Sequence, residues 1–236
     1  MAAFGLVHGA WHGGWCWNLL VEELDRRGHV CVAPDLPFDD PSSTWDTVAD
    51  VMTDALKGID DPVLVGHSLG AMTIPMVAMR RPVKLLVYLC PATPVSKPLV
   101  DSPPSFQEGY KAYLATMQVD ELGRDSWKPD DAARDMYRHL DPALAKWAAG
   151  QLRPDAAGHG AYPLDGPPSL PSIYVYASED EIFTPESRRW AARHAFGLEP
   201  VELAGGHFPM LEAPSALADL LEASLEPEQV RKSVRR

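Results

Sequence analysis

The chain has 236 residues and a mass of 25.9 kDa, which suits one large domain or one domain that carries an insertion. Hydrophobic residues make up 46% of it and charged residues 23%, so disordered and fibrous classes are excluded for most of the chain. The net charge is -12 and the pI about 5.0, a balance that opposes binding to nucleic acid or to an anionic membrane surface.

Three cysteines, Cys16, Cys31 and Cys90, stand beside apolar residues without C-x-x-C spacing, so we expect buried, reduced thiols. The first residues lack the features of a signal peptide, and no 18-residue apolar run occurs. We therefore expect a cytoplasmic protein with no membrane or nucleic-acid partner; a homodimer is left open. The basic residues in 229–236 are interpreted as a frayed tail.

Short apolar runs alternate with segments of helical periodicity, a pattern typical of a mostly parallel sheet with helices on its faces. The predicted strands are residues 4–8, 30–33, 62–66, 84–90, 172–177 and 200–203. This order predicts an α/β fold with a six-stranded sheet.

Helices are predicted over residues 15–27, after Ser43, and over 185–196 and 214–225. Gly28 is expected to close the first helix, because glycine tolerates the left-handed conformation found just past a helix end. Ser42 or Ser43 is expected to cap the second helix.

The stretch from 93 to 171 breaks the alternation, with proline-rich turns at its ends and helical segments near 110–117, 131–140 and 142–152. It leaves the sheet after one strand and returns before the next, so we expect it over the carboxyl edge, where α/β sheets bind ligands. We predict a core of residues 1–92 and 172–228 and a helical lid of residues 93–171. The alternative is a helical decoration with no role in binding.

The sequence Gly66-His67-Ser68-Leu69-Gly70 fits G-x-S-x-G and follows an apolar run. It therefore lies at a strand-to-helix turn, the setting of a nucleophile elbow, where a strained backbone raises the serine hydroxyl above the sheet. The pattern predicts Ser68 as a nucleophile. A serine hydroxyl is weakly nucleophilic near neutral pH and needs an adjacent base.

His207 is the predicted base among the eight histidines. It lies in Gly205-Gly206-His207, a flexible loop before the last helix, where the chain order serine, acid, histidine places the base. His67 directly precedes Ser68, so we expect its side chain to point away from the Ser68 side of the turn. Solvated or structural roles are expected for His29, His139, His159 and His194.

The acid is expected at the end of the strand before the histidine loop, where Glu179, Asp180 and Glu181 stand next to one another. Their spacing does not separate these three neighbours. We favour Asp180, because a short carboxylate suits a hydrogen bond to His207 Nδ1. The flanking glutamates are expected to be solvated.

The glycine-rich loop after the first strand, residues 8–15, predicts part of an oxyanion hole. Such a hole needs two N–H donors aimed where negative charge develops. Leu69 N–H is the expected first donor and Ala10 N–H the second. A phosphate-binding loop is the alternative, but the G-x-G-x-x-G spacing and a following lysine are absent from the sequence.

Four motifs together resemble those of the α/β-hydrolase superfamily, and more narrowly the plant methylesterase and hydroxynitrile lyase group with its bacterial relatives. They are His8 to Trp15, Gly66 to Gly70, Asp180-Glu181-Ile182-Phe183 with Pro185, and Gly205-Gly206-His207. The likeness covers nearly the whole chain and is weakest across residues 93–171. It implies a triad of Ser68, Asp180 and His207, with the N–H groups of Ala10 and Leu69 as the oxyanion hole. No metal or organic cofactor is needed for that chemistry.

The predicted activity is cleavage of a carboxylic ester, thioester or lactone of a small, largely apolar substrate through an acyl-enzyme on Ser68. Gly9, Trp11 and Phe208 are the candidates for the substrate pocket. Two alternatives stay open, because one fold hosts many functions. One is a lyase, cyclase or cofactor-free oxygenase, and the other is a small-ligand receptor that keeps the triad but turns over slowly.

Cyanohydrin-cleaving members of the resembled group carry a lysine directly after the catalytic histidine and a threonine after the first-strand histidine. Phe208 and Gly9 stand at those places here, so no cation meets the charge of a leaving cyanide. We predict hydrolysis of small aryl esters and no cyanide release from mandelonitrile above the buffer rate, measured with a cyanide assay. Rapid, Ser68-dependent cyanide release without esterase activity would make the lyase interpretation the leading one.

Overall fold

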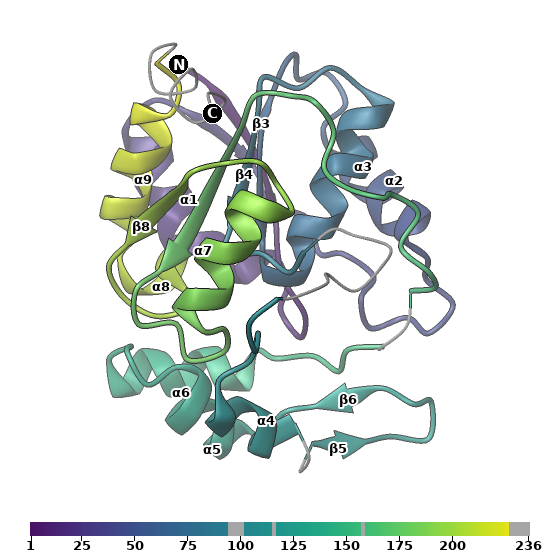
Figure 1. Cartoon of the computed structure of the whole chain (residues 1–236), viewed down its shortest axis with the longest axis vertical. Coiled ribbons are helices and arrows are strands. Elements are labelled where there is room, and N and C mark those ends of the chain that lie inside the picture. The colour runs from purple at the N-terminus through teal and green to yellow at the C-terminus, as the bar shows by residue number, and fades with distance from the viewer. Residues whose placement is uncertain (94–101, 115–116, 157–158, 227–236) are drawn as a thin grey trace.

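A computed structural model describes residues 1–93, 102–114, 117–156 and 159–226, so the basic tail predicted at 229–236 lies outside the described residues. The main strands are β1 (Ala3–Val7), β2 (Val30–Val32), β3 (Val63–His67), β4 (Leu85–Leu89), β7 (Ser172–Ala177) and β8 (Pro200–Leu203). They form one parallel sheet in the order β2-β1-β3-β4-β7-β8 (Figure 1). The predicted six-stranded parallel sheet is confirmed.

The central strands are buried on both faces of the sheet. Successive side chains of a strand point to opposite faces, so each strand contributes to two hydrophobic clusters. In β3, Val63 and Val65 belong to one hydrophobic cluster and Leu64 to the other. Strands β3, β4 and β7 are buried along their whole length. They therefore form a rigid platform for the loops at their carboxyl ends.

Helices cover both faces of this sheet (Figure 1). They are α1 (Asn18–Arg26), α2 (Trp45–Ala55), α3 (Thr73–Arg80), α7 (Pro185–His194), the short α8 (Pro209–Glu212) and α9 (Pro214–Ala223). Side chains of α1 and α9 pack in the first hydrophobic cluster, and those of α2 and α3 in the second. Each helix thus buries one apolar stripe against the strands.

The start of α2 corrects one sequence prediction. The Thr44 side chain, and not that of Ser42 or Ser43, accepts a hydrogen bond from a first-turn N–H. Thr47 returns the bond, since its hydroxyl oxygen accepts from the N–H of Thr44, which completes a capping box. Gly28 closes α1 as predicted, with φ +83.

Residues 102–114 and 117–156, between β4 and β7, form a separate layer against the carboxyl edge of the sheet, whereas residues 159–171 run beside α2 and α3 to the start of β7 (Figure 1). We call residues 93–171 the lid segment, after their predicted role. Its elements are α4 (Glu108–Leu114), β5 (Gln118–Val119), β6 (Asp125–Ser126), α5 (Pro129–Asp131), a π-helical turn (Ala132–Met136) and α6 (Pro142–Gly150). The expected helical segments are present but shorter. The β5–β6 hairpin was not predicted, because strands this short have no readable periodicity.

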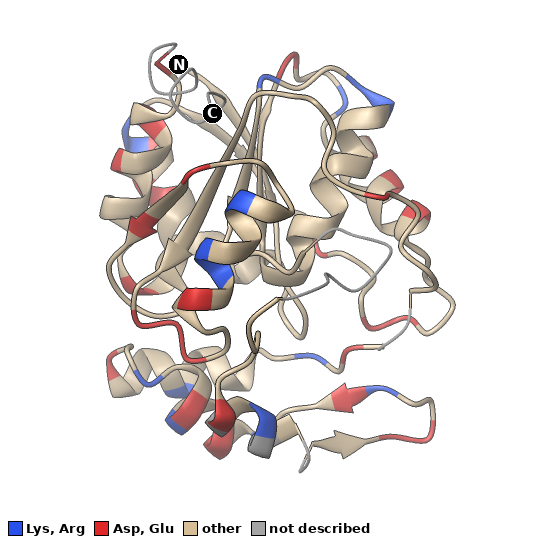
Figure 2. Ribbon diagram, in the orientation of Figure 1, with Lys and Arg blue, Asp and Glu red and all other residues tan. Residues whose placement is uncertain are grey.

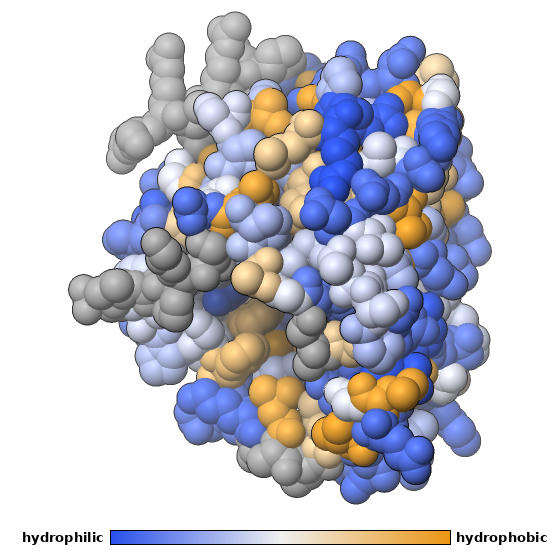
Figure 3. All heavy atoms as spheres, turned by 90° about the vertical axis from the view of Figure 1, so that its right-hand side faces the viewer, coloured by the Kyte–Doolittle hydropathy of each residue, from blue (hydrophilic) through white to orange (hydrophobic). Residues whose placement is uncertain are grey.

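Acidic residues occur on α2, α9 and the lid segment, with basic residues scattered between them (Figure 2). Hydrophobic side chains are also visible among polar ones on the side that carries the hairpin (Figure 3), where Val119 and Leu122 are exposed. Within the described parts of the chain, no helix is long and apolar enough to cross a membrane.

Candidate active site

Ser68 sits in the turn that joins β3 to the helical segment before α3, with φ +51, a left-handed conformation that non-glycine residues rarely adopt. A Cβ atom at Gly66 would lie 2.7 Å from Ala71 Cα, and one at Gly70 would lie 2.3 Å from the His8 carbonyl oxygen. Only glycine fits at these two positions. The close turn leaves Ser68 half-buried at the carboxyl edge of the sheet, as in a nucleophile elbow.

Asp180 and His207 form a buried pair. His207 Nδ1 lies 2.8 Å from Asp180 Oδ2, and Asp180 Oδ1 accepts hydrogen bonds from the N–H groups of Ile182 and Phe183 at 2.8 and 2.7 Å. Fixed by two backbone donors, the carboxylate favours the tautomer with its proton on His207 Nδ1, so Nε2 is the proton acceptor. That Nε2 is buried and has no hydrogen-bond partner in the described chain.

The histidine loop contacts the end of β3 directly. His67 Nε2 lies 2.9 Å from the His207 carbonyl oxygen, and the two rings are 4.8 Å apart. His67, which we expected to point away from the Ser68 side, is thus buried against the predicted base. Burial lowers the pKa of His67 well below its usual value, so its neutral ring donates to that carbonyl.

Gly9 brings the first-strand loop against the elbow. A Cβ atom there would lie 3.0 Å from Ser68 Cβ and 3.2 Å from the His67 carbonyl oxygen. The N–H groups of Ala10 and Leu69 follow the two sides of this contact, and neither donates to another described residue. The predicted oxyanion hole requires two N–H groups of this kind, and their role stays a prediction.

Two further histidines shape the same loop, a role that the sequence analysis did not assign. His8 Nδ1 donates to the Gly9 carbonyl at 2.9 Å, and its Nε2 accepts from a backbone N–H of the loop after β2. His12 Nδ1 lies 2.6 Å from the Ala10 carbonyl and its Nε2 lies 2.7 Å from the Tyr137 hydroxyl. Burial lowers the pKa of His8 to about 4 and that of His12 to about 3, so each neutral ring supplies one donor and one acceptor. In the sequence, the one signal for this role is the position of His8 and His12 on either side of Ala10.

The three residues predicted for the substrate pocket have different surroundings. Gly9 faces the elbow, and Trp11 is half-buried against the lid segment. Phe208 is 2% exposed and stacks on His12 with 5.0 Å between ring centroids, and it also contacts the ring of Tyr137. Phe208 also contacts the ring of the predicted base His207, with 5.0 Å between ring centroids, and its role in a substrate pocket stays a prediction.

Glu181 is buried, which corrects the expectation of a solvated side chain, whereas Glu179 is exposed as expected. The Oε2 atom of Glu181 accepts a hydrogen bond from the His207 N–H at 3.0 Å, and Oε1 of Glu181 has no partner among the residues described. Burial and then the charge of Asp180 raise the pKa of Glu181 to about 8. The carboxyl group is therefore mostly protonated at neutral pH and supports the backbone of the histidine loop.

Cys90, Asp180 and His207 are the one group of described residues whose spacing could hold a metal ion. Metal ligation needs a thiolate, and burial raises the pKa of the Cys90 thiol well above its usual value. The other two side chains are already bonded to each other, so this donor set does not fit an ion. Cys16 is likewise a buried free thiol, as predicted, and Cys31 is half-buried.

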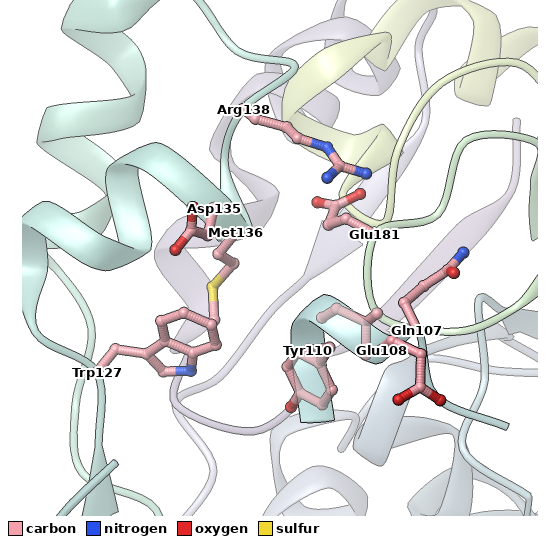
Figure 4. A pocket seen from close by; sticks show the side chains of 9 residues that line it. Gln107, Glu108, Tyr110, Trp127, Asp135, Met136, Arg138 and Glu181 are labelled. Carbon is pink, nitrogen blue, oxygen red and sulfur yellow. The ribbon is translucent and has the colours of Figure 1, made fainter. Parts of the chain in front are cut away.

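A cleft of about 620 Å³ opens between the lid segment and the loop after β7 (Figure 4), a volume typical of small-molecule sites. It is lined by Gln107, Glu108, Tyr110, Trp127, Asp135, Met136, Arg138, Glu181 and Ile182. The rings of Tyr110 and Trp127 stack at 6.2 Å, and Met136 and Ile182 add apolar surface. Since Glu181 and Ile182 directly follow Asp180, the cleft adjoins the loop of the predicted acid.

The fold agrees with comparisons with known proteins. The model of the alpha/beta hydrolase family matches residues 6–220. The chain therefore belongs to the alpha/beta hydrolase family, and it is a hydrolase.

Relatives narrow the likeness further. Methyl jasmonate esterase 1 of Vitis vinifera is 25% identical over 252 residues, covering 94% of this chain and 96% of the relative. The crystal structure of a methylesterase from Arabidopsis has a TM-score of 0.75 at 20% identity, covering 95% of this chain and 99% of that one. A pyrethroid hydrolase from Sphingobium faniae has a TM-score of 0.74 at 22% identity, covering 97% and 99%.

The Asp180–His207 contact generates a prediction for the acid. Asp180→Asn should lower turnover by about 10⁴-fold, because an amide favours the wrong tautomer of the histidine. Glu179→Gln, at an exposed neighbour, should change turnover little. Steady-state kinetics on a chromogenic ester measure both, and equal losses at the two positions would contradict the assignment of Asp180.

The raised pKa of Glu181 predicts a pH dependence of stability. The native state holds this proton up to about pH 8, whereas the unfolded chain releases it near 4.5, so the stabilisation is complete below pH 4.5 and is lost as pH rises through 8. Glu181→Gln should therefore flatten the decline of the unfolding free energy across this window, measured by denaturant titration. Glu179→Gln is the matched control, and an unchanged pH slope in Glu181→Gln would contradict the prediction.

Proposed function

We propose that the protein hydrolyses a carboxylic ester, thioester or lactone of a small, largely apolar substrate through an acyl-enzyme on Ser68. The observation that carries the proposal is the buried Asp180–His207 pair, whose free Nε2 belongs to a loop packed against the strained Ser68 turn. The family membership and the esterase relatives support the same chemistry.

In the acylation step, His207 Nε2 accepts the proton of the Ser68 hydroxyl as its oxygen attacks the substrate carbonyl. No hydrogen bond joins these two groups in the structure, and such bonds often tighten only when substrate binds. Negative charge collects on the carbonyl oxygen, where the N–H groups of Ala10 and Leu69 stabilise it. Collapse of the tetrahedral intermediate breaks the ester bond, and the imidazolium returns its proton to the leaving alcohol.

Deacylation repeats the same steps with water. His207 Nε2 takes a proton from the water molecule, the hydroxide attacks the acyl carbonyl, and the proton then returns to Ser68 as the acid leaves. Asp180 keeps its charge throughout and stabilises the imidazolium in both halves of the reaction. The side chains of this chain supply every proton transfer, so the mechanism needs no cofactor.

The cleft supports the substrate class. Tyr110, Trp127, Met136 and Ile182 offer an aromatic and apolar wall, which suits an apolar acyl or aryl group. A relative that carries the name methyl jasmonate esterase supports an ester with a small alcohol. We therefore propose methyl or aryl esters of an apolar acid as the substrate class. The net charge of -12 favours a small molecule over nucleic acid as the partner.

Replacing the nucleophile tests the proposal. Ser68→Ala should lower turnover on an aryl ester by roughly 10⁶-fold, because the nucleophile is lost, and should abolish labelling by a fluorophosphonate probe. Circular dichroism should show an unchanged fold, since only one hydroxyl is removed. Ser42→Ala, at an exposed serine, is the control and should behave as wild type. A Ser68→Ala protein that keeps more than a few per cent of wild-type activity would rule out the acyl-enzyme.

A further inference from the structure

Trp11 directly follows the predicted oxyanion donor Ala10, and its polar groups are bonded to the lid segment. Its indole Nε1–H donates to Asp125 Oδ1 at 2.6 Å. The backbone N–H of Trp11 donates to Asp155 Oδ2 at 3.4 Å, and its carbonyl accepts from the N–H of Arg153 at 2.8 Å. A residue of the first-strand loop is thus held at three points by a segment more than 100 positions away in the sequence.

The backbone of Trp11 needs such support. Its φ is +62, a left-handed conformation that disfavours a bulky side chain and persists only where the surroundings hold it. The ring is also fixed, because it packs edge-to-face on Trp127 with 6.0 Å between ring centroids. Hydrogen bonds and ring packing from the lid segment therefore hold Trp11 in this conformation.

Asp125 and Asp155 also bond to each other through their backbones. The Asp125 N–H donates to the Asp155 carbonyl at 2.9 Å, and the Asp155 N–H donates to the Asp125 carbonyl at 2.8 Å. Burial raises the pKa of both carboxyl groups, that of Asp155 to about 7. Two acids partly withdrawn from water are costly, and a polar pair of this kind suits a positioning role better than simple packing.

Ala10 lies between two anchored neighbours. On one side, Gly9 packs against Ser68 and His67, which fixes that residue relative to the elbow. On the other side, Trp11 is fixed by the lid segment. The direction of the Ala10 N–H therefore depends on both neighbours, together with the His8 and His12 contacts to the Gly9 and Ala10 carbonyls, and Trp11 is the neighbour held by the lid segment.

We propose that Asp125 and Asp155 are positioning residues that hold Trp11 so that the Ala10 N–H faces the oxyanion formed at Ser68. This inference rests on the proposed function. Since a hydrogen bond weakens steeply as its angle departs from linear, releasing Trp11 lowers the stabilisation of the tetrahedral intermediate. Neither aspartate lines the cleft, so we expect ground-state binding of the substrate to be unaffected. The lid segment thereby contributes to the reaction rate as well as to the substrate cleft.

The test uses the full chain and three variants of one hydrogen bond. Asp125→Ala removes the acceptor, Asp125→Asn keeps a neutral acceptor oxygen, and Trp11→Phe removes the indole N–H but retains an aromatic ring. Glu121→Ala, in the exposed turn of the same hairpin, is the control for loss of a negative charge. The measurements are kcat and KM on an aryl ester, and the inhibition constant of an aryl trifluoromethyl ketone, which adds to Ser68 and places an oxyanion in the hole.

Asp125→Ala and Trp11→Phe should each lower kcat about tenfold, a part of the 10²–10³ that loss of a whole donor costs. KM should stay within about twofold of wild type, and the inhibition constant should rise in step with the loss of kcat, since both report the oxyanion. Asp125→Asn and Glu121→Ala should stay close to wild type. The double variant that combines Asp125→Ala with Trp11→Phe should have a kcat no lower than that of either single variant, because both substitutions remove the same hydrogen bond.

The proposal is overturned if Asp125→Ala and Trp11→Phe leave kcat and ketone binding near wild type, or if they change KM alone. A purely additive double variant overturns it as well. Thermal unfolding identifies variants that do not fold; should Asp125→Ala be one of them, Trp11→Phe decides alone. Wild-type protein that neither hydrolyses the ester nor binds the ketone overturns the proposed function together with this one, whereas active wild type with unaffected variants overturns only this inference.

Discussion

The site depends on how closely three pieces of backbone approach one another at Ser68. The strand before it, the helix after it and the loop after β1 meet where only glycine fits, at Gly66 and Gly70, and Gly9 packs closely against Ser68. This crowding forces the left-handed turn at Ser68, and the parallel sheet holds the turn in place from below. Every other element of the candidate site is arranged around that fixed point.

The surroundings of Ser68 are polar and yet largely buried, which explains why so many histidines cluster there. His8, His12 and His67 are neutral because burial lowers their pKa values. The rings of His8 and His12 each join two groups without a buried charge, and that of His67 bonds to the His207 carbonyl. The protonated carboxyl group of Glu181 serves the histidine loop in the same way. The loops of the site are thus held by neutral hydrogen bonds, and Asp180 remains the acid that orients His207.

The lid segment contacts the first-strand loop as well as the cleft. Its hairpin supplies Asp125 and its later loop supplies Asp155, and the two meet at Trp11. Its helices supply one wall of the cleft, and the core loop after β7 supplies the other. The same segment therefore lines the cleft and contacts the first-strand loop.

The sequence by itself determined the strands, most helices and the identity of Ser68, Asp180 and His207 as candidates, because alternation, capping glycines and short motifs are local signals. It did not place Thr44 rather than Ser42 or Ser43 at the cap of α2, since three neighbouring hydroxyls carry the same propensity. Tertiary structure alone decided that Glu181 is buried, that Phe208 stacks on His12, and that the lid segment contacts Trp11. Those outcomes depend on contacts between residues far apart in the chain, and such contacts leave no periodic trace in the sequence.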